Sequence, residues 1–265
     1  MYNFALHRPS TVSEAAALLA GKADAKLLAG GQTYIPTLKQ RLAQPSDVID
    51  LSGIAELKGI KEEAGGLLVG AMAKHGEVAH SDLVKRVIPA LASLAEGIGD
   101  PQVRNLGTLG GSISNADPAA DYPGALLGLG ASVRTNKRSI AADEFFTGLF
   151  DTALESDEIV TAVHFPKPEK AAYAKFPNPA SRYAMVGVFV AKTSNGVRVA
   201  VTGAGQNGVF RWKEAEQALG SNFSSAAIDG LKVSADSLSG DMHASAEYRA
   251  HLVGVMAQRA VKSIA

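Results

Sequence analysis

Apolar and polar positions follow two different periods along the first third of the chain. From Thr11 to Gly21 the apolar residues recur three or four positions apart, which is the spacing of one helix face. The apolar runs at 25–30 and 47–52 are short and predict buried strands. A second short helix is expected to begin at Pro36, because proline is tolerated at the start of a helix. Strands and helices are therefore mixed from the beginning of the chain.

The middle third continues this mixture. A strand is expected at 66–72, and a helix at 82–99 that Pro89 either bends or restarts. The segment 157–166, with its dense β-branched and apolar residues, predicts a further strand.

The pattern changes after residue 168. Two strand-like runs, 183–192 and 196–205, flank Asn195-Gly196, a dipeptide typical of tight β-hairpins. A long helix is expected at 247–264. This change places a domain boundary near Ala171 and predicts an α+β chain that ends in an antiparallel sheet with helices.

Two glycine-rich loops interrupt these elements, each after an apolar run. The first loop is Gly30-Gly31-Gln32-Thr33, between a predicted strand and a predicted helix. The second surrounds Thr108 with Gly107, Gly110 and Gly111. Glycines in such loops can take positive φ and let backbone N–H groups converge on an anion. A plain turn is the alternative for the first loop taken alone, whereas the two loops together predict one phosphate-bearing cofactor between them.

The second loop contains neither a P-loop lysine motif nor G-x-G-x-x-G spacing. Backbone amides and the hydroxyls of Thr108, Ser112 and Ser114 could instead bind a pyrophosphate without a cation. The Asp121 carboxylate would suit a ribityl or ribose hydroxyl. Helix capping is the alternative for Asp117 and Asp121, and we favour it for Asp117 but not for Asp121.

Composition narrows the function classes. The 265 residues hold 26 basic and 26 acidic side chains, so no overall field favours nucleic acid or an anionic membrane. No apolar run approaches membrane-spanning length and no signal-peptide pattern opens the chain, so we expect a cytoplasmic location. The absence of cysteine excludes thiolate nucleophiles and cysteine-ligated clusters on this chain. The six histidines show no metal-binding spacing, and no metal site is expected.

The two loops, quoted as LLAGGQTYIP and DPQVRNLGTLGGSISNADPAADYP, resemble those of the FAD-binding medium subunit of molybdenum hydroxylases, of the carbon monoxide dehydrogenase type. The flavin domain of xanthine dehydrogenase is a more distant relative. The resemblance covers essentially the whole chain. It implies an α+β fold in which two subdomains of the vanillyl-alcohol oxidase type enclose FAD and a C-terminal domain packs beside them. The implied divisions are 1–56, 57–170 and 171–265.

The resemblance also assigns cofactor contacts. The diphosphate of a non-covalently bound FAD would lie against both loops, Asp121 on the ribityl side, and Ile159 or Val160 against the flavin ring. Lys175 would lie near the polar edge of the ring. The implied contacts are Ala29, Gly30, Gly31, Gln32, Thr33, Thr108, Leu109, Gly110, Gly111, Ser112, Ser114, Asp121, Ile159, Val160 and Lys175.

The function implied by the resemblance is electron transfer. Electrons would come from a large molybdopterin subunit through two [2Fe–2S] clusters on a small subunit, reach the flavin here, and leave to an external acceptor. No residue of this chain is nominated as a catalytic acid or base. Two alternatives stay open: a stand-alone FAD oxidase of the same fold, and a non-catalytic assembly subunit that would be colourless.

Overall fold

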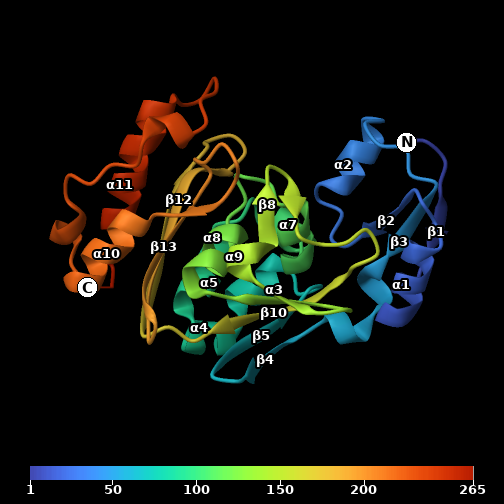
Figure 1. Ribbon diagram of the computed structural model, residues 1–265. Coiled ribbons are helices and arrows are strands. Elements are labelled where there is room, and N and C mark those ends of the chain that lie inside the picture. The colour runs from blue at the N-terminus through green and yellow to red at the C-terminus, as the bar shows by residue number, and fades with distance from the viewer. Residues whose placement is uncertain (265) are drawn as a thin grey trace.

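The computed structural model describes residues 1–264. Three larger β-sheets follow one another along the chain and lie in a row, with the N-terminal region at one end and the C-terminal helices at the other (Figure 1). A two-stranded sheet, β8 with β9, extends from the middle region. Short 3₁₀ turns lie at 51–53, 55–57, 225–228 and 235–237.

The N-terminal region is built on a three-stranded parallel sheet of order β1-β3-β2. Thr11 caps α1, because its hydroxyl accepts a hydrogen bond from the Glu14 backbone amide. Helix α2 begins at Tyr34, earlier than the predicted start at Pro36, since the Ile35 amide already bonds the Gly31 carbonyl. The elements are β1 (Ala5–His7), α1 (Val12–Ala20), β2 (Ala25–Leu28), α2 (Tyr34–Lys39) and β3 (Asp47–Asp50).

The middle region is a five-stranded antiparallel sheet of order β4-β5-β10-β6-β7, with helices packed over it (Figure 1). Pro89 restarts the helix predicted at 82–99, and two helices result. The elements are β4 (Ile60–Glu63), β5 (Gly66–Gly70), α3 (His75–His80), α4 (Asp82–Val87), α5 (Pro89–Glu96), α6 (Pro101–Arg104), α7 (Leu109–Asn115), α8 (Tyr122–Leu129), β6 (Ser132–Thr135), β7 (Ser139–Ala141), α9 (Ala142–Phe145), β8 (Phe146–Gly148), β9 (Asp151–Thr152) and β10 (Val160–Pro166).

The C-terminal region is an antiparallel sheet of order β11-β12-β13-β14 that is covered on both faces. Val188 and Val190 of β12 pack in one core with α11, whereas Phe189 faces the middle region and α8. Gly196 has a φ of 109°, as the predicted Asn-Gly hairpin requires. The elements are β11 (Lys170–Pro177), β12 (Ala184–Thr193), β13 (Gly196–Thr202), β14 (Phe210–Arg211), α10 (Lys213–Ser221) and α11 (Ala246–Lys262).

Helix α8 connects these regions, because it belongs to the middle region and packs on β12 and β13 of the C-terminal sheet. The division at 1–56, 57–170 and 171–265 stays a prediction, and its final residue, Ala265, lies outside the described residues. Within residues 1–264 there is no helix with the length and apolar character needed to cross a membrane.

Candidate functional site

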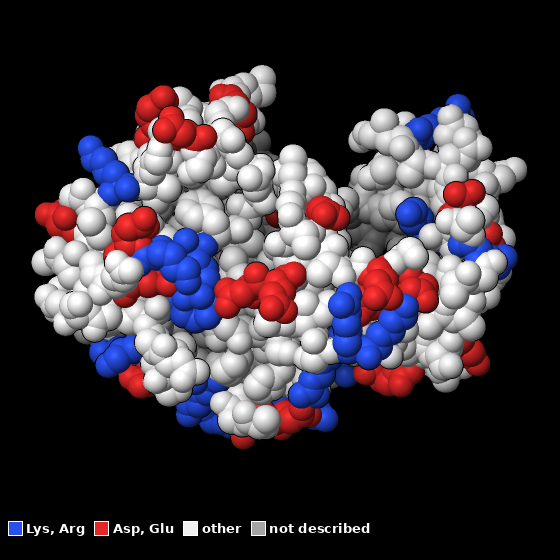
Figure 2. Space-filling view, viewed as in Figure 1, with Lys and Arg blue, Asp and Glu red and all other residues white. Residues whose placement is uncertain are grey.

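A cleft of about 740 Å³ lies between the N-terminal region and the middle region. The surface is visibly hollowed there, between the lobe at the right and the centre of the molecule (Figure 2). Both glycine loops line the cleft, and residues 181–183 of the C-terminal region complete its wall. Small-molecule sites have volumes of roughly 300–1,000 Å³, so the cleft has the size of a cofactor site.

Sequence-predicted contacts from all parts of the chain meet in this cleft. All but two line it: Ala29, Gly30, Gly31, Gln32, Thr33, Thr108, Gly110, Gly111, Ser112, Ser114, Asp121, Ile159 and Val160.

Leu109 and Lys175 do not contribute to the wall of the cleft. The Leu109 side chain is fully buried in the core of the middle region, as expected for an apolar residue in the first turn of α7. Lys175 lies behind Asp121, with its Nζ 2.9 Å from Oδ2 of that carboxylate, and it also donates to the Gly97 carbonyl. Its charge is thus held by a carboxylate instead of pointing into the cleft.

The first loop presents unpaired backbone donors. Gly31 has a φ of 72°, which turns the chain between β2 and α2. Among the described residues, the amides of Gly30, Gly31, Gln32 and Thr33 donate no hydrogen bond to the protein. Gly30 and Gly31 are half-buried and Gln32 and Thr33 are exposed, so these amides are free to donate to an anionic ligand in the cleft.

The second loop uses its amides within the protein. Leu109 donates to the Ala73 carbonyl and Gly110 to the Ala71 carbonyl, while the Gly111 amide is taken by Thr108 Oγ1. The expectation that amides of both loops face the ligand is therefore wrong for 109–111. The reason is that this loop is fastened to the chain that follows β5.

Hydroxyl groups take the place of amides on that side of the cleft. Ser112 and Ser114 both line the cleft, and neither hydroxyl makes a hydrogen bond within the described residues. The two loops also touch directly, because a Cβ on Gly30 would stand 2.1 Å from the Leu106 carbonyl oxygen. A ligand between the loops would therefore meet amides from one side and hydroxyls from the other.

Tyr34 belongs to no sequence motif, yet its hydroxyl is a further unpaired donor. It is enclosed and has no hydrogen-bond partner, and the residue lines the cleft at the start of α2. An enclosed hydroxyl without a partner is costly unless a ligand satisfies it. Only its position directly after the first loop could have suggested it.

Asp121 does not cap α8, although it occupies the capping position. Its carboxylate instead accepts hydrogen bonds from the Tyr173 hydroxyl and from Lys175. Burial raises the pKa of Asp121, and the Lys175 charge opposes that rise. Asp117, for which we favoured a helix cap, makes a tight turn by accepting from the Ala119 amide. Asp121 is thus a fixed acceptor in the wall, as its predicted role requires.

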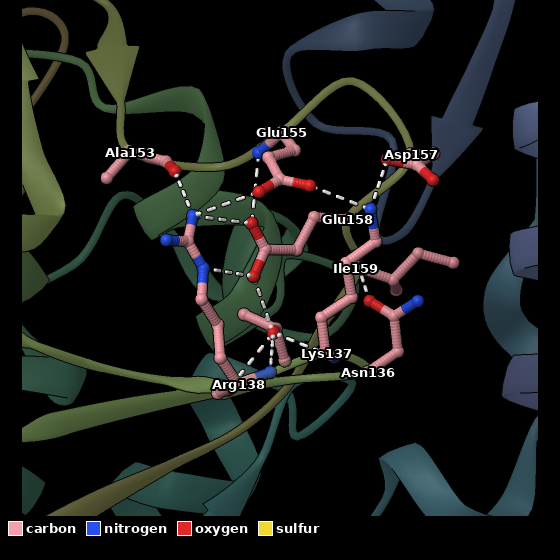
Figure 3. Close-up of polar contacts among 9 residues, drawn as sticks. Asn136, Lys137, Arg138, Ala153, Glu155, Asp157, Glu158 and Ile159 are labelled. Carbon is pink, nitrogen blue, oxygen red and sulfur yellow. Dashed lines mark hydrogen bonds and ion pairs between the residues drawn. The ribbon is translucent and has the colours of Figure 1, made fainter.

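A polar network sets the position of Ile159 (Figure 3). The Arg138 guanidinium donates to both oxygens of Glu158, whose side chain is fully covered, and this lowers the pKa of Glu158 to about 2. The Ile159 amide donates to Asn136 Oδ1 at 2.8 Å. Ile159 packs with the core of the N-terminal region, so the network holds an apolar wall across the two regions.

The donor set fits a diphosphate-bearing aromatic cofactor. Residues with neutral N–H and O–H groups line the cleft, and so do the apolar residues Leu51, Met72 and Ile159. Among residues 1–264 no three histidine, aspartate or glutamate side chains gather as metal ligands would. The arrangement therefore suits FAD and gives no site for a metal in the described part of the chain.

Comparison with known proteins agrees with this geometry. Residues 2–168 match the family described as the FAD binding domain in molybdopterin dehydrogenase, and residues 171–264 match the CO dehydrogenase flavoprotein C-terminal domain. The carbon monoxide dehydrogenase medium chain of Hydrogenophaga pseudoflava is 33% identical, over 98% of this chain and 96% of that protein. The nicotine 6-hydroxylase medium subunit of Paenarthrobacter nicotinovorans is 36% identical, over 96% and 94%.

A solved structure has the same fold. Carbon monoxide dehydrogenase from Hydrogenophaga pseudoflava, in a form lacking the Mo-pyranopterin moiety, contains a chain that matches with a TM-score of 0.89 at 34% identity. The match covers 98% of this chain and 96% of that one. The predicted α+β fold, with a flavin-binding part and a C-terminal domain, is confirmed. The chain belongs to the FAD-binding medium-subunit family of the molybdopterin-containing dehydrogenases, which are oxidoreductases.

Proposed function

We propose that this chain is the electron-transfer subunit of a heteromeric molybdenum hydroxylase. It receives electrons from [2Fe–2S] clusters on a small partner subunit and passes them to an external acceptor. A large partner subunit carries the molybdopterin cofactor and the substrate site. The observation that carries the proposal is one cleft with unpaired amides on one side and unpaired hydroxyls on the other, in a family whose members bind FAD.

The residues of this chain bind and orient the cofactor. The amides of the first loop and the hydroxyls of Ser112 and Ser114 hold the diphosphate. Asp121, fixed by Tyr173 and Lys175, accepts a hydrogen bond from a ribityl hydroxyl. Ile159 and Val160 form an apolar wall that excludes water. Bound FAD itself supplies the redox chemistry, since it can exchange electrons singly and in pairs.

The attachment is non-covalent in this proposal. The chain has no cysteine, and the first loop contains no histidine, so neither of these side chains is available there for a covalent link. FAD should therefore leave the polypeptide on acid or heat denaturation.

The names of the relatives support partner subunits. They are called a medium chain and a medium subunit, and they are named for carbon monoxide and for nicotine at similar identity to this chain. This supports an assembly in which a partner subunit binds the substrate and this chain binds the flavin.

Anaerobic titration followed near 450 nm tests the proposal. The purified full chain should be yellow and should bleach with dithionite, but not with purines, aldehydes, aromatic heterocycles or carbon monoxide. Addition of matching large and small subunits should allow one substrate class to bleach it. Rapid flavin reduction by a small substrate without partners would favour a stand-alone oxidase, and a protein that binds no FAD would favour an assembly subunit.

A further inference from the structure

His75 lies directly under the contact between the two glycine loops. It is the first residue of α3, its side chain is buried with 5% exposure, and it lines the cleft. Its ring packs against the Tyr122 ring at 5.4 Å between centroids. A histidine that belongs to no sequence motif is therefore part of the cleft wall.

The imidazole is not satisfied by the protein. Nδ1 is enclosed without a hydrogen-bond partner, and no hydrogen bond within the described residues uses either ring nitrogen. Burial and, to a lesser extent, the nearby Arg104 charge together lower the pKa of His75 to about 4, so the ring is neutral near pH 7. A neutral imidazole has one N–H donor and one lone pair. Because an enclosed N–H without a partner is rarer than an enclosed lone pair, the proton belongs on Nε2.

Gly107 leaves space for the Nε2 edge of the ring. A Cβ on Gly107 would stand 2.6 Å from Nε2 and 2.8 Å from Cδ2 of His75. Gly107 also lines the cleft, and a Cβ on Gly30 would stand 2.8 Å from the Gly107 Cα. His75, Gly107 and Gly30 are thus stacked at the point where the loops meet. A side chain on Gly107 would push His75 away, and a side chain on Gly30 would push the two loops apart.

We propose that His75 is a positioning residue of the cofactor site, whose Nε2–H donates a hydrogen bond to a phosphate oxygen of the bound diphosphate. The inference rests on the proposed function, because it needs a diphosphate between the loops. It explains why residue 107 is a glycine, since a side chain there would occupy the space of the imidazole edge. It also gives that side of the cleft a neutral nitrogen donor where the amides of 109–111 are already used.

Binding of FAD and of ADP to the full chain by calorimetry tests this role. His75→Met keeps the length of the side chain without a donor and should weaken FAD and ADP alike by about tenfold, the value of one hydrogen bond to a charged group. His75→Gln restores a donor near Nε2 and should bind within about threefold of the unmodified chain. Equal losses in the Met and Gln variants, or loss for FAD without loss for ADP, would overturn the assignment.

Gly107→Ala provides an independent variant that leaves His75 in place. Its Cβ would displace the imidazole edge, so FAD and ADP should again bind more weakly, while circular dichroism shows an intact fold. Full FAD affinity in this variant would contradict the inference. If the unmodified chain bound no FAD, the proposed function itself would fail, whereas FAD binding that is insensitive to His75→Met would refute only the role of His75.

Discussion

The two glycine loops have similar sequences but use their backbones in opposite ways. In the first loop the amides of 30–33 are free of internal partners, and positive φ at Gly31 sets the turn. In the second loop the amides of 109–111 are taken within the protein, and Gly110 is needed because a Cβ there would stand 2.7 Å from that of Ala71. One loop therefore presents backbone donors, and the other is a fixed wall that presents side-chain hydroxyls.

A Gly-Gly pair can therefore meet either of two requirements, which the sequence alone does not distinguish. At Gly31 the requirement is conformational, and at Gly110 it is steric. If this comparison is correct, substitutions in the two loops should affect FAD affinity and stability in different proportions.

Gly31→Val should have the largest effect and should abolish measurable FAD binding. Positive φ costs a side chain roughly 1–2 kcal/mol, and the Cβ would stand 2.5 Å from Ile35 Cδ1. Together with distortion of the free amides, we expect a loss of at least about 100-fold in affinity. Gly65→Val is the matched control and should matter little for binding, because Gly65 has the same φ of 72° but a Cβ there meets nothing within 4 Å. Normal FAD content in Gly31→Val, with the fold intact by circular dichroism, would refute the role of the first loop.

Replacing both Ser112 and Ser114 by alanine tests the hydroxyl side alone. Two hydrogen bonds to a charged diphosphate would be lost, at roughly tenfold for each, so affinity for FAD should fall about 100-fold. Isothermal calorimetry measures the change, and Ser263→Ala on the C-terminal helix end serves as a control remote from the cleft. An affinity unchanged by the double substitution would leave the first loop as the sole phosphate site.

Gly111→Ala should weaken FAD binding with little change in the stability of the fold. Gly111 has no positive φ, and its Cβ would stand 2.9 Å from Thr108 Oγ1 and 3.5 Å from Ala29 Cβ, between the loops. Weakening the Thr108 cap costs about 1 kcal/mol, and alanine regains a similar amount in helix propensity. The melting temperature should hardly change, while FAD affinity falls roughly 30-fold because a methyl group occupies the cleft. A large fall in melting temperature with unchanged affinity would reverse this assignment.

Glu158→Gln should have the smallest effect on FAD and a clear effect on stability. The Arg138 hydrogen bonds lower the pKa of Glu158 from 4.5 to about 2, so the ionised form stabilises the fold above about pH 4.5 and this contribution is lost as the pH falls toward 2. The variant should lose about 2 kcal/mol at pH 7 and progressively less below pH 4.5 in urea unfolding. FAD affinity should change only about threefold, because the Ile159 amide keeps Asn136.

The control for that experiment is Glu169→Gln, which removes an exposed ion pair with Lys192 and should cost less than about 1 kcal/mol. Equal pH dependence of unfolding in the Glu158 variant and the unmodified chain would show that the network in Figure 3 does not depend on the Glu158 charge.

Many of the helices, strands and turns could be predicted, because their signals are local in the sequence. The elements around both loops follow from short apolar runs ending at glycine, and the hairpin at Asn195-Gly196 follows from its dipeptide. Strand β12 was recognisable as a run of apolar residues, since both of its faces are buried. These features depend on neighbours along the chain, which a sequence displays directly.

Long-range pairing explains what could not be predicted. Amides of the second loop donate to the carbonyls of Ala71 and Ala73. Nothing in the sequence marks these two alanines as hydrogen-bond acceptors for a loop that follows them by more than 30 residues. The withdrawal of Lys175 from the cleft depends on its ion pair with Asp121, a contact between strand β11 and the start of α8. Neither His75 nor Tyr34 belongs to a sequence motif. Their unpaired polar atoms can be recognised only from the three-dimensional arrangement of the groups around them.

Binding of a diphosphate in the cleft between the loops can be measured by comparing two ligands. Calorimetric titration of the full chain with FAD and with riboflavin, which has the flavin ring and ribityl chain but no diphosphate, measures the contribution of the loops. We expect one FAD per chain, competition by ADP, and riboflavin binding at least about 100-fold weaker. Riboflavin binding as tight as FAD, or FAD binding that ADP does not affect, would contradict the account.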